Sequence, residues 1–281
     1  MIIARLFGGL GNQMFQYAAG KSLAERLGAE LALDFRIIDE RGTRRLTDVF
    51  DLDIVPATNL PATKHENLLR YGLWRAFGQS PKFRRETGLG YNAAFAEWSD
   101  DTYLHGYWQS EQYFSAISDH LRRVFQAVPA PSKENGAIAD DIRDCSAISL
   151  HVRRGDYLAL GAHGVCDEAY YNAALSHIAP QLNQDPRVFV FSDDPQWAKD
   201  NLPLPFEKIV VDLNGPTTDY EDLRLMSLCD HNIIANSSFS WWGAWLNANP
   251  DKIVTAPANW FADAKLDNPD ILPEGWQRIT P

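Results

Sequence analysis

The stretch Ser149-Leu-His-Val-Arg-Arg-Gly-Asp-Tyr157 decides the fold that this sequence predicts. The apolar run over residues 147–152 is typical of a buried strand, and two arginines and a glycine follow it directly. Strand side chains alternate between faces, so Arg153 and Arg154 can face one ligand only if the chain turns there, as Gly155 permits. Guanidinium groups bind phosphate oxygens in a bidentate manner, which indicates a site for a polyanion such as a nucleoside diphosphate. Surface ion pairs are the alternative explanation for the two arginines.

Strand-like and helix-like segments alternate on the C-terminal side of the chain. Strands are expected at residues 147–152, 188–192, 208–212, 232–235 and 253–256, and helices at 169–182, 195–201, 220–229 and 240–247. This alternation predicts an α/β fold with a parallel sheet wrapped by helices. Ligands of such sheets bind at the carboxyl ends of the strands, close to helix N-termini.

The N-terminal part begins with a similar unit. A strand is expected at residues 2–7, a glycine-rich loop at 8–11, a helix at 12–27 that Gly28 ends, and a strand at 30–34. Residues 41–123 are interpreted as irregular, with helical candidates at 66–77 and 111–125. The proline-rich stretch Val128-Pro-Ala-Pro-Ser132 is the best linker candidate. We therefore expect two domains, 1–127 and 128–281, with a final segment able to pack back on the first.

Composition excludes several classes of function. The 281 residues include 45% hydrophobic side chains, enough for one or two packed cores, and the formal net charge is −11. That charge argues against bulk binding of nucleic acid, so an anionic ligand must be held locally. Three widely spaced cysteines match neither a disulfide framework nor a zinc site. With no apolar run of eighteen residues, we expect no transmembrane segment and a cytoplasmic protein, with peripheral contact at the inner membrane face left open.

The glycine loop has three interpretations. Gly9 and Gly11 let the backbone approach a ligand at a helix N-terminus. The pattern resembles the start of a dinucleotide-binding fingerprint, with Asp34 as the ribose-binding acid, but Met14 occupies the place of the third glycine. A tight turn between a strand and a helix is the third interpretation.

Two aspartates follow the strand expected at 188–192. Asp194 is placed to cap the next helix with Pro195 in its first turn, which leaves Asp193 to accept hydrogen bonds from the N1–H and N2–H groups of guanine. The alternative is that both aspartates only cap. A metal site is not expected, because no third ligand lies at a useful spacing.

The stretch Asn236-Ser-Ser-Phe-Ser-Trp-Trp-Gly-Ala-Trp-Leu246 follows the strand expected at 232–235. Its serines can cap a helix or bind a phosphate group. Its three tryptophans are expected to pack against the sheet and are not assigned as ligands.

Four stretches together resemble the α-1,2-fucosyltransferases of glycosyltransferase family 11. They are Gly8-Gly-Leu-Gly-Asn-Gln-Met-Phe-Gln-Tyr-Ala18, His151-Val-Arg-Arg-Gly-Asp-Tyr157, Phe191-Ser-Asp-Asp194 and Asn236-Ser-Ser-Phe-Ser-Trp-Trp-Gly243. The resemblance implies a GT-B-like fold of two Rossmann-like domains facing a cleft. It also implies inverting transfer of fucose from GDP-β-L-fucose to the 2-hydroxyl of a terminal galactose, in an oligosaccharide or glycolipid, with no cofactor and no required metal.

The resemblance also implies roles for particular residues. Arg153 and Asn12 would act at the reacting centre, Arg153 on the donor diphosphate. The donor-binding set would comprise Gly9, Gly11, His151, Arg153, Arg154, Asp156, Asp193, Ser237, Ser238 and Phe239. The general base is not identified, and Asp34, Asp39 and Asp156 are its candidates.

Two alternatives differ in function. A fucosyltransferase of another linkage or acceptor, such as an α-1,6 or a protein O-fucosyltransferase, would use the same donor. A non-catalytic nucleotide-sugar or glycan-binding protein would release no GDP.

Overall fold

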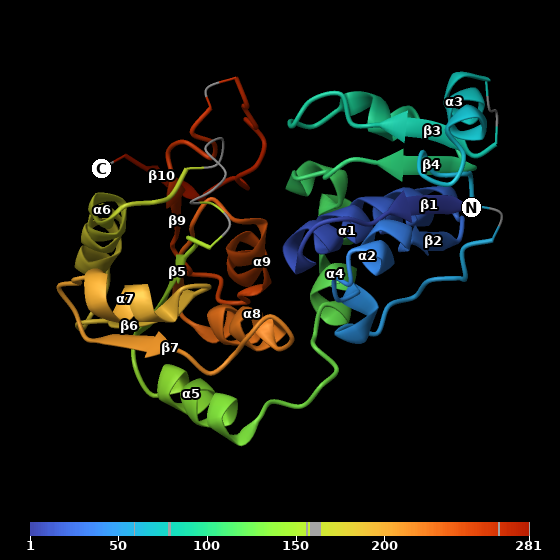
Figure 1. The fold of residues 1–281 in the computed structure, drawn as a ribbon. Coiled ribbons are helices and arrows are strands. Elements are labelled where there is room, and N and C mark those ends of the chain that lie inside the picture. Colours follow the sequence, from blue (N-terminus) through green and yellow to red (C-terminus); the bar gives the residue numbers. More distant parts are fainter. Residues whose placement is uncertain (59, 78–79, 156, 158–163, 264, 281) are drawn as a thin grey trace. The chain divides into compact units, whose positions relative to one another are not determined.

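The computed structural model describes residues 1–58, 60–77, 80–155, 157, 164–263 and 265–280. The chain divides into two compact units (Figure 1). Unit 1 consists of Met1–Val124 with Asn268–Ile271, and unit 2 consists of Phe125–Asp267 with Leu272–Pro281.

Unit 1 is built on a four-stranded parallel sheet with the order β2-β1-β4-β3. Its strands are β1 (Ile2–Arg5), β2 (Leu31–Asp34), β3 (Lys82–Arg85) and β4 (Thr102–His105), and its helices are α1 (Leu10–Leu27), α2 (Arg36–Glu40), α3 (Leu68–Phe77) and α4 (Ser118–Val124). The strand, glycine loop, helix and second strand predicted at the N-terminus are confirmed. Helix α1 ends as expected, with Gly28 in the left-handed conformation.

The prediction of an irregular segment over 41–123 was wrong, because this segment supplies β3 and β4. Each strand has only four residues, and β3, Lys82-Phe-Arg-Arg85, carries three cations at the edge of the sheet. Charged edge strands of this kind give no clear hydrophobic period. The single helix predicted at 111–125 is also wrong: 3₁₀ turns at Glu111–Tyr113 and Ser115–Ile117 precede α4.

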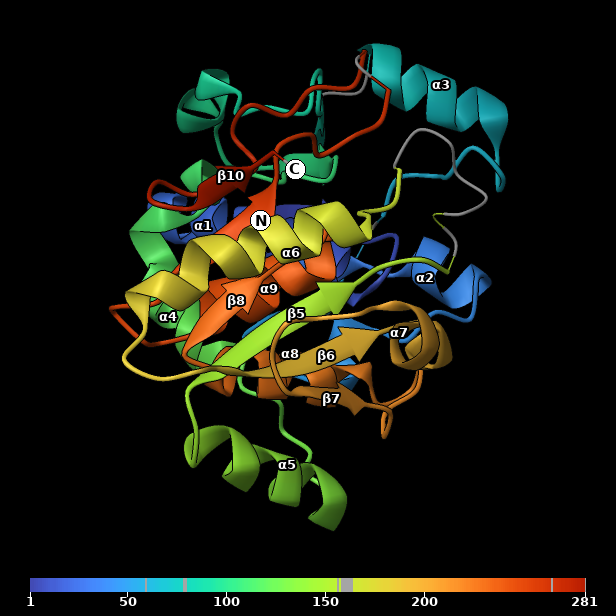
Figure 2. The same ribbon diagram turned by 90° about the vertical axis from the view of Figure 1, so that its left-hand side faces the viewer.

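Unit 2 contains a six-stranded parallel sheet with the order β10-β9-β8-β5-β6-β7 (Figure 2). Its strands are β5 (Ala147–Val152), β6 (Arg187–Ser192), β7 (Lys208–Val211), β8 (His231–Ile233), β9 (Val254–Pro257) and β10 (Gln277–Ile279). Its helices are α5 (Lys133–Arg143), α6 (Glu168–Ile178), α7 (Pro195–Asn201), α8 (Asp219–Leu228) and α9 (Ser238–Leu246). The predicted alternation is confirmed, and the sequence analysis missed only α5 and β10 among the described helices and strands of this unit.

Side chains along β5 alternate between the two faces of the sheet, and each face packs against its own layer of helices. Ile148, Leu150 and Val152 belong to the core cluster formed with apolar residues of α6 and α7. Ser149 and His151 therefore point to the opposite face, where the Ser149 Oγ accepts a hydrogen bond from the Asn232 Nδ2 at 2.7 Å. Figure 2 shows α6 in front of the sheet and α8 and α9 behind it.

The sheet of unit 2 reverses its strand order at one point. In unit 2 the chain proceeds from β5 through β6 to β7 in one direction, and then from β8 through β9 to β10 on the other side of β5. In unit 1 the steps from β1 to β2 and from β3 to β4 both run in the same direction along the sheet, with β1 and β4 side by side at its centre. Ligands bind at such reversal points in open parallel sheets, because the two helices that follow diverge to opposite faces. The Arg153–Arg154 loop begins at this point of unit 2, and the glycine loop follows β1, one of the two central strands of the unit 1 sheet.

Two further features are the state of the cysteines and the apolar character of the helices. Cys145, Cys166 and Cys229 are free, as the spacing predicted. Among the described helices, none has both the length and the apolar character needed to cross a membrane.

The carboxyl group of Asp222 makes the stability of unit 2 depend on pH. Burial raises its pKa to about 7, with a smaller contribution from the neighbouring Asp219 and Glu221, although the Asn214 Nδ2 donates a hydrogen bond to its Oδ1 at 2.7 Å. The folded state therefore holds a proton that the unfolded state has lost. The stability contributed by this group is present below about pH 4 and is lost as the pH rises to about 7.

We expect Asp222→Asn to raise the free energy of unfolding at pH 8 by about 1 kcal/mol and to change it little at pH 4. The full pKa shift of Asp222 would correspond to a larger gain in the free energy of unfolding, at about 1.4 kcal/mol per pKa unit. We expect a smaller gain because the side chain is only half-buried and solvent screens its charge. Urea unfolding at both pH values measures the effect, with the exposed Asp251→Asn as the control. Equal changes at pH 4 and pH 8 would contradict the prediction.

Candidate functional site

The sequence-predicted residues of unit 2 follow three neighbouring strands at the same edge of the sheet. Strand β5 lies between β6 and β8, and all three run parallel, with Val152 beside Ser192 and Leu150 beside Ile233. The loops that follow them carry the paired arginines, the paired aspartates and the paired serines. The structure thus brings these three motifs together at the carboxyl edge, from positions up to 85 residues apart in the sequence (Arg153 to Ser238).

Asp193 joins the two arginines to the end of β6. Its Oδ2 lies 3.1 Å from the Arg153 Nη1, and its Oδ1 accepts the backbone N–H of Arg154 at 2.9 Å. The sequence analysis took Asp193 to be free of such partners, and that assumption was wrong. Because both carboxylate oxygens hold the β5 loop, this side chain helps to position the Arg153 guanidinium.

Gly155 is required here for a reason other than the one predicted. It is not among the glycines of positive φ. A Cβ at this position would instead lie 2.5 Å from the Oδ2 of Asp193. The absence of a side chain therefore lets the arginine loop close over the carboxylate.

Arg154 has a separate set of contacts. Its guanidinium lies over the ring of Trp197, 3.8 Å from the centroid, and its Nε is 3.7 Å from the Asp194 Oδ2. The Asp194 Oδ1 accepts the backbone N–H of Trp197 at 3.2 Å, so Asp194 caps α7 with Pro195 in the first turn, as predicted. The arginines do form ion pairs, but their side chains are only 31% and 18% exposed, unlike those of ordinary surface pairs.

His151 lies below this loop, on the face of β5 that α9 covers. It is buried, and its ring centroid is 5.9 Å from that of Phe239. Burial and the nearby Arg153 lower its pKa to about 3, so the imidazole is neutral near pH 7. Its Nδ1 has no hydrogen-bond partner among the described residues. A neutral imidazole can orient neighbouring groups, but it contributes no positive charge to the binding of an anion.

The serine motif forms the N-terminus of α9. The Ser237 Oγ accepts the backbone N–H of Phe239 at 3.3 Å, so Ser237 is the N-cap, and Ser238 is the first helical residue. The three tryptophans are buried, as the packing interpretation predicted: Trp241, Trp242 and Trp245. A helix start with no acidic residue in its first turn is favourable for anions.

The glycine loop of unit 1 is held by amide side chains. Gly8 has φ +83°, and a Cβ there would lie 2.6 Å from the Asn12 Nδ2. Gly9 precedes α1 without a side-chain cap, and a Cβ there would meet nothing within 4 Å. The Gln13 Nε2 donates to the Gly8 carbonyl at 3.2 Å, and the Gln16 Oε1 accepts the Phe7 N–H at 2.9 Å. Gly11 lies in the first turn of α1.

Sequence reasoning missed the loop that follows β4. The Gln109 Nε2 donates to the Asn12 Oδ1 at 2.8 Å, which links the loops that follow the neighbouring strands β1 and β4. Trp108 has φ +58°, and its backbone N–H donates to the half-buried Glu86 carboxylate, whose pKa is raised by its partial burial. Because β3 and β4 were not predicted, nothing in the sequence placed Gln109 beside Asn12.

The three candidates for the general base differ in their surroundings. Asp34 is buried and accepts hydrogen bonds from Arg36 and from the Tyr103 hydroxyl; although burial opposes its charge, these bonds hold its pKa below the usual value. Asp39 pairs with Arg45 at 2.6 Å. Asp156 lies outside the described residues. The described geometry does not select a base.

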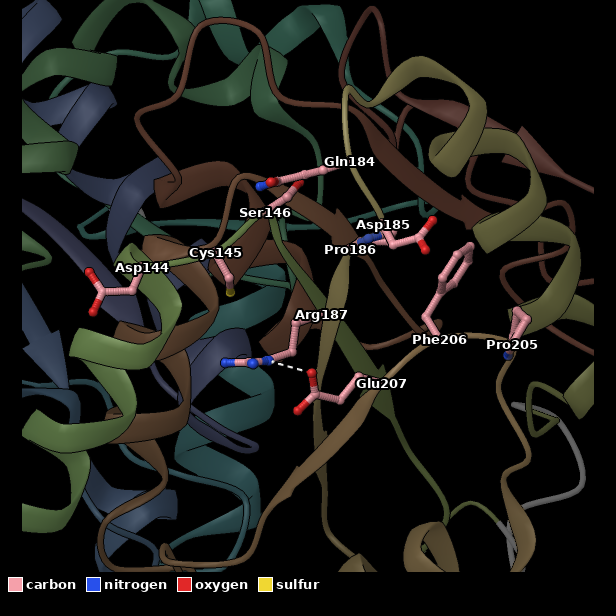
Figure 3. A pocket seen from close by; sticks show the side chains of 10 residues that line it. All are labelled: Asp144, Cys145, Ser146, Gln184, Asp185, Pro186, Arg187, Pro205, Phe206 and Glu207. Atoms are coloured by element: carbon pink, nitrogen blue, oxygen red, sulfur yellow. Dashed lines mark hydrogen bonds and ion pairs between the residues drawn. The ribbon is translucent and has the colours of Figure 1, made fainter.

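A cavity of about 360 Å³ lies at the other edge of the unit 2 sheet (Figure 3). It is lined by Arg187, the first residue of β6, and by residues that precede β5, β6 and β7: Asp144, Cys145, Ser146, Gln184, Asp185, Pro186, Pro205, Phe206 and Glu207. Arg187 and Glu207 form an ion pair of 2.9 Å across it. Ligands of parallel sheets bind at the carboxyl edge, so we place the functional site at the arginine loop and not in this cavity. Among the described residues, no cluster of three His, Cys, Asp or Glu side chains could hold a metal ion.

Comparisons with known proteins agree with the motifs. The model of the family "Glycosyl transferase family 11" matches residues 87–280. An α-1,2-colitosyltransferase of Escherichia coli is 35% identical over 294 residues, covering 99% of this chain and 99% of that protein. Human galactoside α-(1,2)-fucosyltransferase 1 is 28% identical over 160 residues, covering 55% of this chain and 42% of that protein.

A solved structure supports the fold. A mutant of Arabidopsis thaliana FUT1 in complex with GDP aligns with a TM-score of 0.56 at 12% identity, covering 91% of this chain and 70% of that one. The predicted GT-B-like α/β architecture, with two parallel sheets wrapped by helices, is confirmed. From the family match, the length of the colitosyltransferase alignment and the four motifs at these loops, we conclude that the chain belongs to glycosyl transferase family 11 and is a glycosyltransferase.

Proposed function

We propose that this enzyme transfers L-fucose from GDP-β-L-fucose to the 2-hydroxyl of a terminal galactose, with inversion at the sugar carbon and without a metal ion. The acceptor would be an oligosaccharide or a glycolipid. The observation that carries the proposal is the pair of partly buried guanidinium groups that Asp193 and Asp194 hold at the reversal point of the unit 2 sheet.

The charges of the reaction suit these residues. As the bond between fucose and GDP breaks, negative charge grows on the diphosphate and positive charge on the sugar. A fixed guanidinium where negative charge develops stabilises the transition state by a few kcal/mol, about the contribution of one preorganised donor. Arg153 would supply this charge, with Arg154 and the start of α9 at Ser237 and Ser238 beside it.

Asp193 would serve two purposes. A carboxylate offers about four lone-pair sites, and contacts with Arg153 and Arg154 occupy one on each oxygen. The other sites would accept the N1–H and N2–H groups of guanine, a pair of donors that adenine lacks. His151, Phe239 and Asp156 complete the donor-binding set that we propose in this unit.

In unit 1 the proposal assigns Asn12 to the reacting centre and Gly9 and Gly11 to close contact with the donor. The hydrogen bond from Gln109 to the Asn12 Oδ1 fixes the orientation of the amide, and the Asn12 Nδ2 lies next to Gly8. Because the donor is β-linked and the product α-linked, the acceptor hydroxyl must attack from the face opposite GDP in a single displacement. We assign no general base.

Colitosyl transfer is the second candidate, favoured by the 35% identity to a colitosyltransferase over nearly the whole chain. Colitose is L-fucose without the 3-hydroxyl, so both donors present the same diphosphate and guanine to the residues of unit 2. The two functions differ only in the group that recognises the third carbon of the sugar.

A product assay tests the proposal. The purified enzyme, with a β-galactoside acceptor and either GDP-fucose or GDP-colitose, should form an α-1,2-linked product, with a higher kcat/KM for GDP-fucose. NMR of the product gives the linkage and the anomeric configuration. An assay in excess EDTA should retain activity. A preference for GDP-colitose would contradict the proposed donor, and a product of another linkage would contradict the proposed α-1,2 transfer. Loss of activity in EDTA that a divalent cation restores would contradict the metal-independent mechanism.

We expect Arg153→Ala to lower kcat/KM at least a hundredfold, because it removes a charge-matched interaction that strengthens in the transition state. Arg153→Lys should restore little activity, since lysine keeps the charge but loses the planar fork of donors. Circular dichroism checks that the fold is retained. Full activity of the lysine variant would exclude the bidentate contact.

The aspartates give a matched pair of variants. Asp193→Ala should raise the inhibition constant of GDP more than that of ADP, because two charge-assisted hydrogen bonds to guanine are lost, each typically about 1.5–3 kcal/mol. Asp194→Ala should leave the ratio of the two constants unchanged and lower the free energy of unfolding by about 1 kcal/mol, as loss of a helix cap does.

Inhibition constants and melting temperatures of both variants decide between the two roles of Asp193. Parallel loss of GDP and ADP binding in Asp193→Ala, with an unchanged ratio, would leave only the positioning of Arg153. That outcome would remove the guanine assignment.

A further inference from the structure

Helix α3 presents an apolar face to solvent. Leu69, Leu73 and Phe77 are spaced four residues apart, so they lie along one face of the helix, with Leu68 beside them. Their side chains are 72%, 52%, 79% and 64% exposed in the order Leu69, Leu73, Phe77 and Leu68. Four of the nine large hydrophobic residues that are exposed in the described chain thus lie on ten consecutive residues. Exposed apolar groups gathered in this way mark an interaction surface.

The opposite face of α3 fastens the helix to unit 1. The Trp74 ring packs against Phe83 and Tyr103, with centroids 5.1 Å apart in both cases, and its Nε1 donates to the Pro81 carbonyl at 3.0 Å. Arg75 lies over the Phe83 ring at 4.8 Å. The exposed leucines are therefore not the result of a detached helix. The helix is fixed with its apolar face outward.

The segment that carries this apolar face is positively charged. Residues 64–86 contain six lysines and arginines and two glutamates, a net charge of +4, whereas the rest of the chain carries −15. A groove of about 560 Å³ runs beside α3, lined by Lys64, Leu68, Tyr71, Gly72, Arg75, Ala76 and Phe83. Its walls are mainly apolar, with Lys64 and Arg75 as the cations. Among the described residues, no carboxylate forms an ion pair with Lys64, Arg70 or Arg75.

We propose that the exposed face of α3 and the adjoining groove dock on the surface of an anionic lipid bilayer. Leucine and phenylalanine side chains enter the boundary between headgroups and acyl chains, and the flanking cations bind lipid phosphates, the combination typical of interfacial helices. A second copy of this chain is a poorer occupant, because two surfaces of like charge would meet. The negative remainder of the chain is repelled by the same membrane, so the charge distribution also selects which side faces the lipid.

The proposal is tested by sedimentation with vesicles of phosphatidylglycerol and phosphatidylcholine, compared with vesicles of phosphatidylcholine alone. We expect the full chain to bind the anionic vesicles at least tenfold more strongly. The double variant Leu69→Glu with Leu73→Glu should lose at least tenfold of this binding, and Lys64→Gln with Arg70→Gln should lose most of the preference for anionic lipid. Transferase activity on a water-soluble acceptor, or release of GDP, should stay unchanged in both, which shows that they fold.

The matched control is Leu213→Glu with Leu228→Glu, two leucines of unit 2 that are 48% and 36% exposed. It should bind vesicles less than twofold more weakly than the parent protein. No binding of the parent protein to anionic vesicles, or equal loss in the control, would overturn the proposal. So would a dimer in light scattering that Leu69→Glu with Leu73→Glu converts to a monomer, because the face would then be covered by a second copy. The vesicle-binding and light-scattering readouts do not depend on which sugar or acceptor the enzyme uses.

Discussion

The carboxylate of Asp193 is the group on which the site in unit 2 depends. Two guanidinium groups on adjacent residues repel each other at the end of a buried strand, and Asp193 and Asp194 supply the opposite charge from the neighbouring strand. The contact with Asp193 also accounts for Gly155, since a Cβ would strike the carboxylate. The cation pair is therefore in place before any anion arrives. Such preorganisation is what makes a fixed charge effective in catalysis, because nothing has to be reorganised as the bond breaks.

Strand order explains why motifs so distant in the sequence meet. The chain leaves β5 toward β6 and β7 and returns to the other side of β5 as β8, so the loops after β5, β6 and β8 become neighbours. In unit 1 the strands β1 and β4 are neighbours, and the hydrogen bond from Gln109 to Asn12 joins the loops that follow them. In both units the catalytic candidates follow from topology and not from proximity in the sequence.

The sequence alone predicted the helices and strands that have a clear hydrophobic period or a continuous apolar run. It did not predict the elements that lack such a pattern. The strand at 147–152 was placed to the residue, because six apolar or buried positions end at two charges. Strands β3, β4 and β10 have three or four residues and carry cations or aromatic groups that also suit loops, so only pairing with a neighbour defines them. For the same reason the sequence could not predict the partners of Asp193 and Asn12. A helix cap such as Asp194 can be recognised from the residues next to it. An ion pair between residues of two different strands cannot, because it depends on how the strands pair.

The two arginines and the two aspartates beside them balance in charge, which bears on how an acidic protein would hold the proposed anionic nucleotide. A guanidinium has five N–H donors, so one group can hold a carboxylate and a phosphate oxygen at the same time. The diphosphate would then add to the Asp193 contact without replacing it. Because the side chains of both arginines are mostly buried, their field is screened less by salt than that of surface charges. Local geometry can thus outweigh a net charge of −11, which acts over distances that salt screens.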